Sequence, residues 1–360
     1  MKVSDRGLWI ESPIPMADSL LWTVPLRLVE AVATGRPAEL GTVPPPLADR
    51  LPEIRDIYAA WIKGGSAVPL IYNRAPSAPD APQGVSLFFS GGVDSYHSLV
   101  KHRDEIDQLI LVHGFDIPLT ETVFFSTAES LVRRAAQTFG KRLIVVRTNL
   151  HWDESTAFTG QGRTPCPWVM YYGAAMAGVA HALAPIHRKV YFASTYAYGE
   201  LRPAGSHPLL DPLWSTDSLA IVHDGGERRI DKLRDLIVYP DILANLRVCW
   251  QSFARPNCGR CEKCVRTMLG LRALGVESCP AFPTPLTPDL VRSQALDAIV
   301  VMLWRELLDS DLPAGLKNAV RAAIGSCEAG LPPRTGKPRQ ELRRLYYASR
   351  NAARALRAAF

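Results

Sequence analysis

The chain has 360 residues, of which 47% are hydrophobic and 21% charged, with a mean hydropathy of zero and a formal net charge of +6. This composition is that of a soluble globular protein with enough core for one or two domains. It excludes a transmembrane helix, because no run of about 18 uninterrupted apolar residues occurs, and residues 19–24 make a poor secretory signal. We therefore expect a cytoplasmic protein.

The positive charge is concentrated at the C-terminal end. Residues 331–360 carry eight basic side chains against one acid, Glu341, a net +7 that leaves about −1 for the first 330 residues. The body is thus not expected to bind nucleic acid through its charge. Within the tail, apolar residues recur at helical spacing opposite the arginines, which predicts a helix over 340–359. Such a helix packs on its own domain or on a second copy in a homodimer, and contact with RNA or an anionic membrane is the alternative.

The first 83 residues form a proline-rich extension. We expect it to be irregular apart from two helical patterns, at 25–33 and 48–63. Its residues suggest no chemistry.

From residue 84 the pattern alternates between strands and helices, which is typical of a parallel sheet with crossover helices. Helices are predicted at 95–102, 121–139, 168–183 and 229–236, and strands at 85–89, 109–113, 143–147, 190–194 and 219–223. We expect an α/β fold with a doubly wound, mostly parallel sheet over 84–248. Ligands bind such sheets beyond the carboxyl ends of the strands. After residue 274 the chain is expected to be helical, at 288–308 and 316–327, within a C-terminal extension over 276–360.

A glycine-rich turn follows the first of these strands. It reads Ser90, Gly91, Gly92, Val93, Asp94 and Ser95, and then a helical pattern begins. Two glycines allow a tight turn whose N–H groups, with the helix N-terminus, form an anion site, to which serine hydroxyls can add donors. The Walker pattern is absent, because no Gly-Lys-Ser/Thr follows.

Four cysteines lie within sixteen residues. Cys249, Cys258, Cys261 and Cys264 have the spacing C-x8-C-x2-C-x2-C, and the two-residue gaps let successive sulfurs face one ion. Four thiolates predict a closed, tetrahedral structural zinc site over 249–275, with an iron–sulfur cluster as the competing interpretation. Such a metal site also favours a reducing compartment.

The turn resembles the pyrophosphate-binding loop of the N-type ATP pyrophosphatases, the PP-loop superfamily. Followed by the four cysteines, it resembles the 7-cyano-7-deazaguanine synthases of queuosine biosynthesis over roughly residues 84–275. The resemblance implies a fold of the adenine nucleotide alpha hydrolase-like HUP type. It also implies that the turn residues bind the pyrophosphate of ATP and that the cysteines bind Zn²⁺. Residues 195–217 depart from the family pattern, so we expect a divergent paralogue with a changed acceptor.

The expected reaction is an ATP-dependent C–N ligation. A small carboxylate, or a modified nucleobase precursor, attacks the α-phosphorus of ATP, pyrophosphate leaves, and ammonia from solution converts the adenylate to an amide or nitrile. We expect Asp94 and Ser95 to be catalytic, Mg²⁺ to bind the phosphates with Asp94 as partner, and adenine to lie near His113 and Phe115. His207 is the candidate for acceptor binding.

Two other functions remain open. An RNA sulfurtransferase for tRNA thiolation would use the same loop with Cys166 as the sulfur carrier, although a small core residue is the more ordinary role of such a cysteine. A nucleotide-binding adaptor without catalysis is the third interpretation.

Overall fold

The computed structural model describes residues 1–75, 84–151, 166–249 and 251–330. The chain divides into two compact units, Met1–Glu227 and Arg228–Phe360, and each is described by itself. Within the described residues, no helix is both long and apolar enough to cross a membrane.

The first unit is built around a seven-stranded sheet with the order β1-β2-β7-β6-β5-β8-β9. Five of these strands, from β7 to β9 in that order, are mutually parallel, and they confirm the five strands expected from the sequence. They are β5 (Val85–Phe88), β6 (Gln108–His113), β7 (Arg142–Thr148), β8 (Lys189–Ala193) and β9 (Ala220–Asp224). All four residues of β5 are buried, as expected for a strand covered on both faces.

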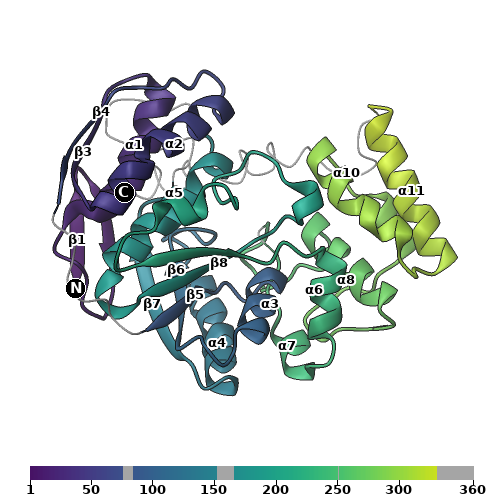
Figure 1. Ribbon diagram of the computed structural model, residues 1–360. Helices are drawn as coiled ribbons and strands as arrows, with labels where there is room; N and C mark the ends of the chain where they lie inside the picture. Colours follow the sequence, from purple (N-terminus) through teal and green to yellow (C-terminus); the bar gives the residue numbers. More distant parts are fainter. Residues whose placement is uncertain (76–83, 152–165, 250, 331–360) are drawn as a thin grey trace, which may run out of the picture. The chain divides into compact units, whose positions relative to one another are not determined.

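Helices cover both faces of this sheet, on opposite sides in Figure 1. On one side lie α3 (Val93–Lys101) and α4 (Thr122–Thr138), and on the other α5 (Trp168–Ala182). From β5 the chain proceeds to β6 and β7 in one direction, and α5 then returns it to β8 on the other side of β5. This arrangement confirms the α/β, mostly parallel and doubly wound character. Its switch point lies beside β5.

The N-terminal segment is not irregular, and that expectation was wrong. β1 (Lys2–Asp5) and β2 (Leu8–Glu11) pair antiparallel with each other, and β2 continues antiparallel onto β7. A second, two-stranded parallel sheet contains β3 (Ala38–Val43) and β4 (Leu70–Arg74). The two expected helices are present as α1 (Val24–Thr34) and α2 (Pro45–Trp61), with η1 (Leu20–Thr23) before them. Their apolar side chains share one core with the central sheet.

Small residues let α5 lie deep in this unit. A side chain at Gly178 would meet the Trp22 carbonyl, and one at Gly173 would collide with the backbone of Gly205. The Gly205 N–H donates to the Val169 carbonyl at 2.7 Å. The chain after β8 therefore runs directly against α5. Three short turns of 3-10 helix also belong to this unit, η2 (Ala184–Ile186), η3 (Tyr198–Glu200) and η4 (Asp211–Trp214).

The second unit is helical over its described part. Its elements are α6 (Arg229–Leu236), α7 (Pro240–Asn245), α8 (Glu262–Ala273), α9 (Pro288–Arg292), α10 (Ala298–Arg305), η5 (Glu306–Asp309) and α11 (Ala314–Glu328). The helix expected over 288–308 is divided, since Asp297 caps α10 by accepting the Val300 N–H. The basic helix expected over 340–359 lies outside the described residues.

Two buried histidines lead to a prediction about acid stability. Burial lowers the pKa values of His181 and His187 to about 4 from 6.5. Both rings are therefore neutral in the folded chain near pH 7, whereas the unfolded chain takes up their protons below pH 6.5. Their contribution to the free energy of unfolding, on the order of 3 kcal/mol each, is complete above pH 6.5 and is lost as the pH falls to about 4.

The check is urea denaturation followed by circular dichroism across pH 7.5 to 4. In a His181→Gln/His187→Gln double variant the fall should be shallower than in the wild type. An equally steep fall in the variant would assign the acid sensitivity to carboxyl groups elsewhere.

Candidate functional site

The glycine-rich turn lies at the carboxyl end of β5, beside the switch point. The Phe89 N–H still donates to Ile110 on β6 at 2.8 Å, and Gly91 then has φ 78°, the left-handed region that glycine tolerates best. Gly92 precedes α3 as its N-cap, without a side chain that caps the helix. The first N–H groups of α3 have no acceptor within the helix, so they could donate to an anion placed beyond the strand end.

Both expected catalytic residues lie in the first turn of α3. Asp94 is half-buried, and Ser95 is buried with its hydroxyl donating to the Gly92 carbonyl at 3.0 Å. The Ser95 hydroxyl therefore holds the turn together, and it must rotate if it is to donate to a phosphate. Ser90 is half-buried at the start of the turn.

A buried carboxylate fixes α3 to the sheet. Asp224, at the end of β9, accepts the Ser98 hydroxyl at 2.6 Å and contacts His102 Nε2 at 2.9 Å and Lys101 Nζ at 3.1 Å. Burial alone would raise the pKa of Asp224, but these three groups hold it below its ordinary value. Sequence reasoning did not identify the role of Asp224 in supporting the helix that carries the turn.

The two residues expected near adenine are in different surroundings. His113 is buried, stacks on Phe125 of α4 with ring centroids 3.9 Å apart, and has Nε2 3.0 Å from the Pro118 carbonyl. Burial lowers its pKa. Phe115 instead joins an aromatic group beyond β6 and β7, where His151 stacks on Trp168 at 4.2 Å and the Phe115 ring meets Trp168 at 5.5 Å. His113 is thus packed against α4, whereas Phe115 belongs to this aromatic group.

His207 lies in a buried polar cluster that also contains Ser206, Asp211 and His223. Asp211 Oδ2 accepts the Ser206 hydroxyl at 2.6 Å and lies 2.6 Å from His223 Nδ1, while Asp211 Oδ1 accepts the His207 N–H at 3.3 Å. The Leu209 N–H donates to His207 Nδ1 at 3.0 Å. Burial, followed by the nearby His223, lowers the pKa of His207, so its ring is neutral near pH 7 and Nε2 carries the proton. The sequence pointed to His207 but not to Asp211.

The four cysteines come together in the second unit. Their Sγ atoms all lie within 4.8 Å of one another, with Cys249 3.7 Å from Cys261 and Cys258 4.0 Å from Cys264. A tetrahedral ion bound at about 2.3 Å would separate its sulfurs by about 3.8 Å. The cluster could therefore hold a metal ion such as zinc.

Local backbone geometry explains how the sulfurs converge. Gly259 has φ 71°, and a side chain there would meet Thr284. This turn lets the N–H of Cys261 donate to Cys258 Sγ at 3.2 Å. The buried side chain of Asn257 accepts the Val248 and Cys249 N–H groups at 2.8 and 3.2 Å and donates to Leu246 and Ala281. Asn257 was not identified from the sequence. It positions Cys249, the cysteine that is separated from the other three in the sequence.

The helix that follows the cluster is anchored by a buried ion pair. On α8, Glu262 accepts from Arg266 at 2.7 Å and from the Trp304 indole of α10 at 2.9 Å. All three side chains are buried. The helix that begins within the cysteine cluster is thus packed against α10.

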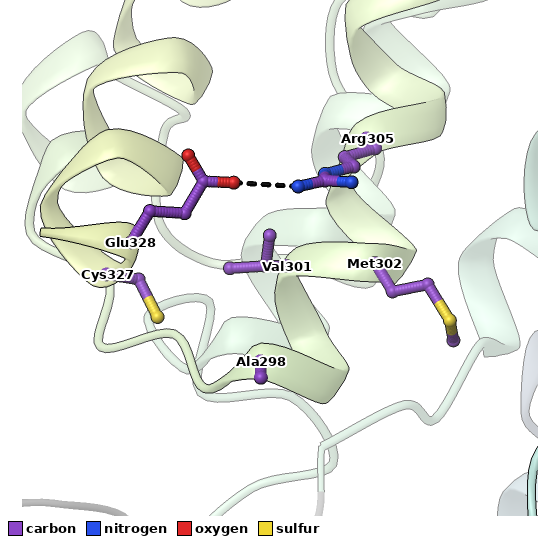
Figure 2. A pocket seen from close by; sticks show the side chains of 6 residues that line it. All are labelled: Ala298, Val301, Met302, Arg305, Cys327 and Glu328. Carbon is purple, nitrogen blue, oxygen red and sulfur yellow. Dashed lines mark hydrogen bonds and ion pairs between the residues drawn. The ribbon is translucent and has the colours of Figure 1, made fainter. Parts of the chain in front are cut away.

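A small surface hollow lies elsewhere in this unit, between α10 and α11 (Figure 2). Its lining includes Val301, Met302 and Cys327, and the exposed pair Arg305–Glu328 spans it at 2.8 Å. Because this lining has no converging set of polar groups, we do not place the functional site there.

Comparison with family models, with curated proteins and with solved structures finds no match to this chain. The fold and the candidate sites described above therefore stand on the chain's own residues.

Proposed function

We propose that this chain is an ATP-dependent ligase of the PP-loop ATP pyrophosphatase type, with a HUP-type fold. It would adenylate a small carboxylate, release pyrophosphate, and form an amide or nitrile with ammonia, in the manner of a 7-cyano-7-deazaguanine synthase. The observation that carries the proposal is the turn from Ser90 to Ser95, which directs backbone N–H groups beyond the central strand of a doubly wound sheet.

In this proposal the protein mainly positions reactants and stabilises charge on the leaving group. Backbone N–H groups of Gly91, Gly92 and Val93 and the hydroxyl of Ser90 would hold the pyrophosphate. Asp94 would bind Mg²⁺, which neutralises the phosphates, and Phe115 would contact adenine. The polar cluster around His207 would face the acceptor.

Zinc is the metal that we propose for the four cysteines. In a cubane iron–sulfur cluster each thiolate binds a different iron, which spaces the sulfurs farther apart than around a single ion. Separations of 3.7 and 4.0 Å favour one shared ion. Its role would be to stabilise the fold of the second unit.

The test is product analysis by ³¹P NMR and chromatography, with ATP, MgCl₂, ammonium chloride and a panel of heteroaromatic carboxylic acids. We expect AMP and pyrophosphate. Titration calorimetry with the α,β-methylene analogue of ATP, which cannot be cleaved between those phosphates, tests binding without any acceptor. ADP and phosphate as products, or no binding of the analogue, would contradict the proposal.

The RNA sulfurtransferase alternative requires a reactive thiol at Cys166. This side chain is buried, and burial raises its pKa to about 12, so the thiol stays protonated and is a poor nucleophile. We expect Cys166→Ala to change the rate of AMP formation by less than about twofold, since a buried thiol contributes packing alone. The measurement is the same product assay, and a loss of tenfold or more would favour sulfur transfer.

A further inference from the structure

One ring nitrogen in the buried polar cluster of Ser206, His207, Asp211 and His223 makes no hydrogen bond within the described residues. His223 Nδ1 is held by Asp211 at 2.6 Å, but the buried His223 Nε2 has no hydrogen-bond partner among the described residues. The His223 side chain is 4% exposed and that of Asp211 is 0% exposed. A buried polar atom without a partner lowers the stability of a fold by about 1–3 kcal/mol. A ligand that hydrogen-bonds to Nε2 would remove this penalty.

The hydrogen bond between His223 and Asp211 determines what could bind at Nε2. Because Asp211 accepts the Nδ1 proton, a neutral ring presents Nε2 as an acceptor with an available lone pair. Asp211 is a buried carboxylate, and its salt-bridge partner within the described residues is His223, which carries a positive charge only when it is protonated. A buried negative charge is stabilised by a positive one close by. The cluster therefore suits a small cation that can donate a hydrogen bond to Nε2.

The location suits a reactant. In the sheet register, His223 on β9 pairs with Phe192 on β8, and β8 pairs in turn with β5. The imidazole is thus two strands from β5, about 10 Å across the sheet, near the carboxyl ends of the strands. The rings of Tyr172 and His207 also lie close to Asp211. Because Nε2 is buried, a partner there has to be small.

We propose that His223 Nε2 binds ammonium and accepts its proton, so that the cluster generates the ammonia used at the acceptor site. This inference rests on the proposed function. Ammonium, the form that predominates near neutral pH, has no lone pair with which to attack. Transfer of one N–H proton to Nε2 releases ammonia and leaves an imidazolium paired with the Asp211 carboxylate. The ammonia lone pair then forms a C–N bond to the adenylate carbonyl carbon, and the bond from that carbon to the AMP oxygen breaks. The departing AMP phosphate accepts the surplus N–H proton, which leaves a neutral amide. Asp211 acts as a positioning residue.

The primary experiment requires neither ATP nor an acceptor. The full chain, labelled with ¹⁵N-histidine, is titrated with ammonium chloride and, separately, with potassium chloride, since potassium is similar in size but donates no hydrogen bond. We expect a saturable shift of the His223 Nε2 resonance with ammonium alone. His187 is the internal control, because Ser86 and Ala180 already engage both of its ring nitrogens. No ammonium-specific shift at His223 would overturn the inference.

Variants connect this site to turnover. His223→Gln should raise the half-saturating ammonium concentration at least tenfold in the ligation assay, while hydroxylamine, which is largely unprotonated at neutral pH, restores product. Asp211→Asn should weaken the ammonium-dependent shift at least tenfold in a chain whose circular dichroism is unchanged. Equal ammonium dependence in His223→Gln would contradict the inference. A saturable shift in a protein that forms no AMP would instead reject the proposed function and leave the ammonium site standing.

Discussion

Cys261→Ser is expected to release the bound metal and to destabilise the second unit by on the order of 10 kcal/mol, the contribution of a structural zinc site. A serine hydroxyl is a poor ligand for zinc, and the three remaining sulfurs no longer form a closed tetrahedron. Elemental analysis of the purified variant and thermal unfolding by circular dichroism measure the two effects. We expect less than one equivalent of metal and an early transition from the helices that follow the cysteines.

The matched control is Cys327→Ser, because this thiol donates to the Leu296 carbonyl at 3.1 Å, and a hydroxyl can make the same bond. The control should keep one equivalent of metal and the transition of the wild type. A folded, metal-free Cys261→Ser protein with an unchanged transition would show that the four sulfurs have no structural role.

Asp94→Ala is expected to lower the rate of AMP formation by about 10²–10³-fold, the effect of removing a group that stabilises charge in a transition state. The residue is half-buried in the first turn of α3, so its removal should leave the fold intact. The measurement is steady-state release of pyrophosphate at saturating ATP and MgCl₂, with circular dichroism to verify folding.

Asp104→Ala is the control for this change, since the Asp104 side chain is 96% exposed and lies just beyond α3. It should retain the wild-type rate. If Asp94→Ala also kept that rate, the role of the turn in ATP cleavage would be rejected, whereas loss of rate with unchanged nucleotide binding would assign Asp94 to the reaction step rather than to affinity.

The parallel strands could be predicted because their sequences are short apolar runs bounded by turns. Val85, Leu87 and Phe88 are buried, and this burial is what the apolar pattern reports. The cysteine cluster could be predicted for a similar reason, because the short spacing between the cysteines brings their sulfurs close together, and the sulfurs do converge.

Other features depend on contacts between residues that are far apart in the sequence, which no local sequence pattern predicts. β1 and β2 are short and only partly buried, and their position is fixed by pairing with β7, as in the partnership of Ile10 and Thr148. Likewise Asp211 meets His223 across twelve residues and Asp224 meets Ser98 across 126. Burial of a carboxylate is decided by a partner that only the folded chain supplies.

His223 and Asp224 are neighbours in β9, and consecutive side chains of a strand point to opposite faces of its sheet. Through Asp224 one face supports the helix of the glycine-rich turn, and through His223 the other face holds the chain that follows β8. A slip of β9 by a single residue would exchange imidazole and carboxylate and disable both at once. We therefore expect single-residue insertions or deletions within this edge strand to be tolerated less well than substitutions at its solvent-facing positions. The adjacent positions of these two residues thus limit which sequence changes the strand accepts.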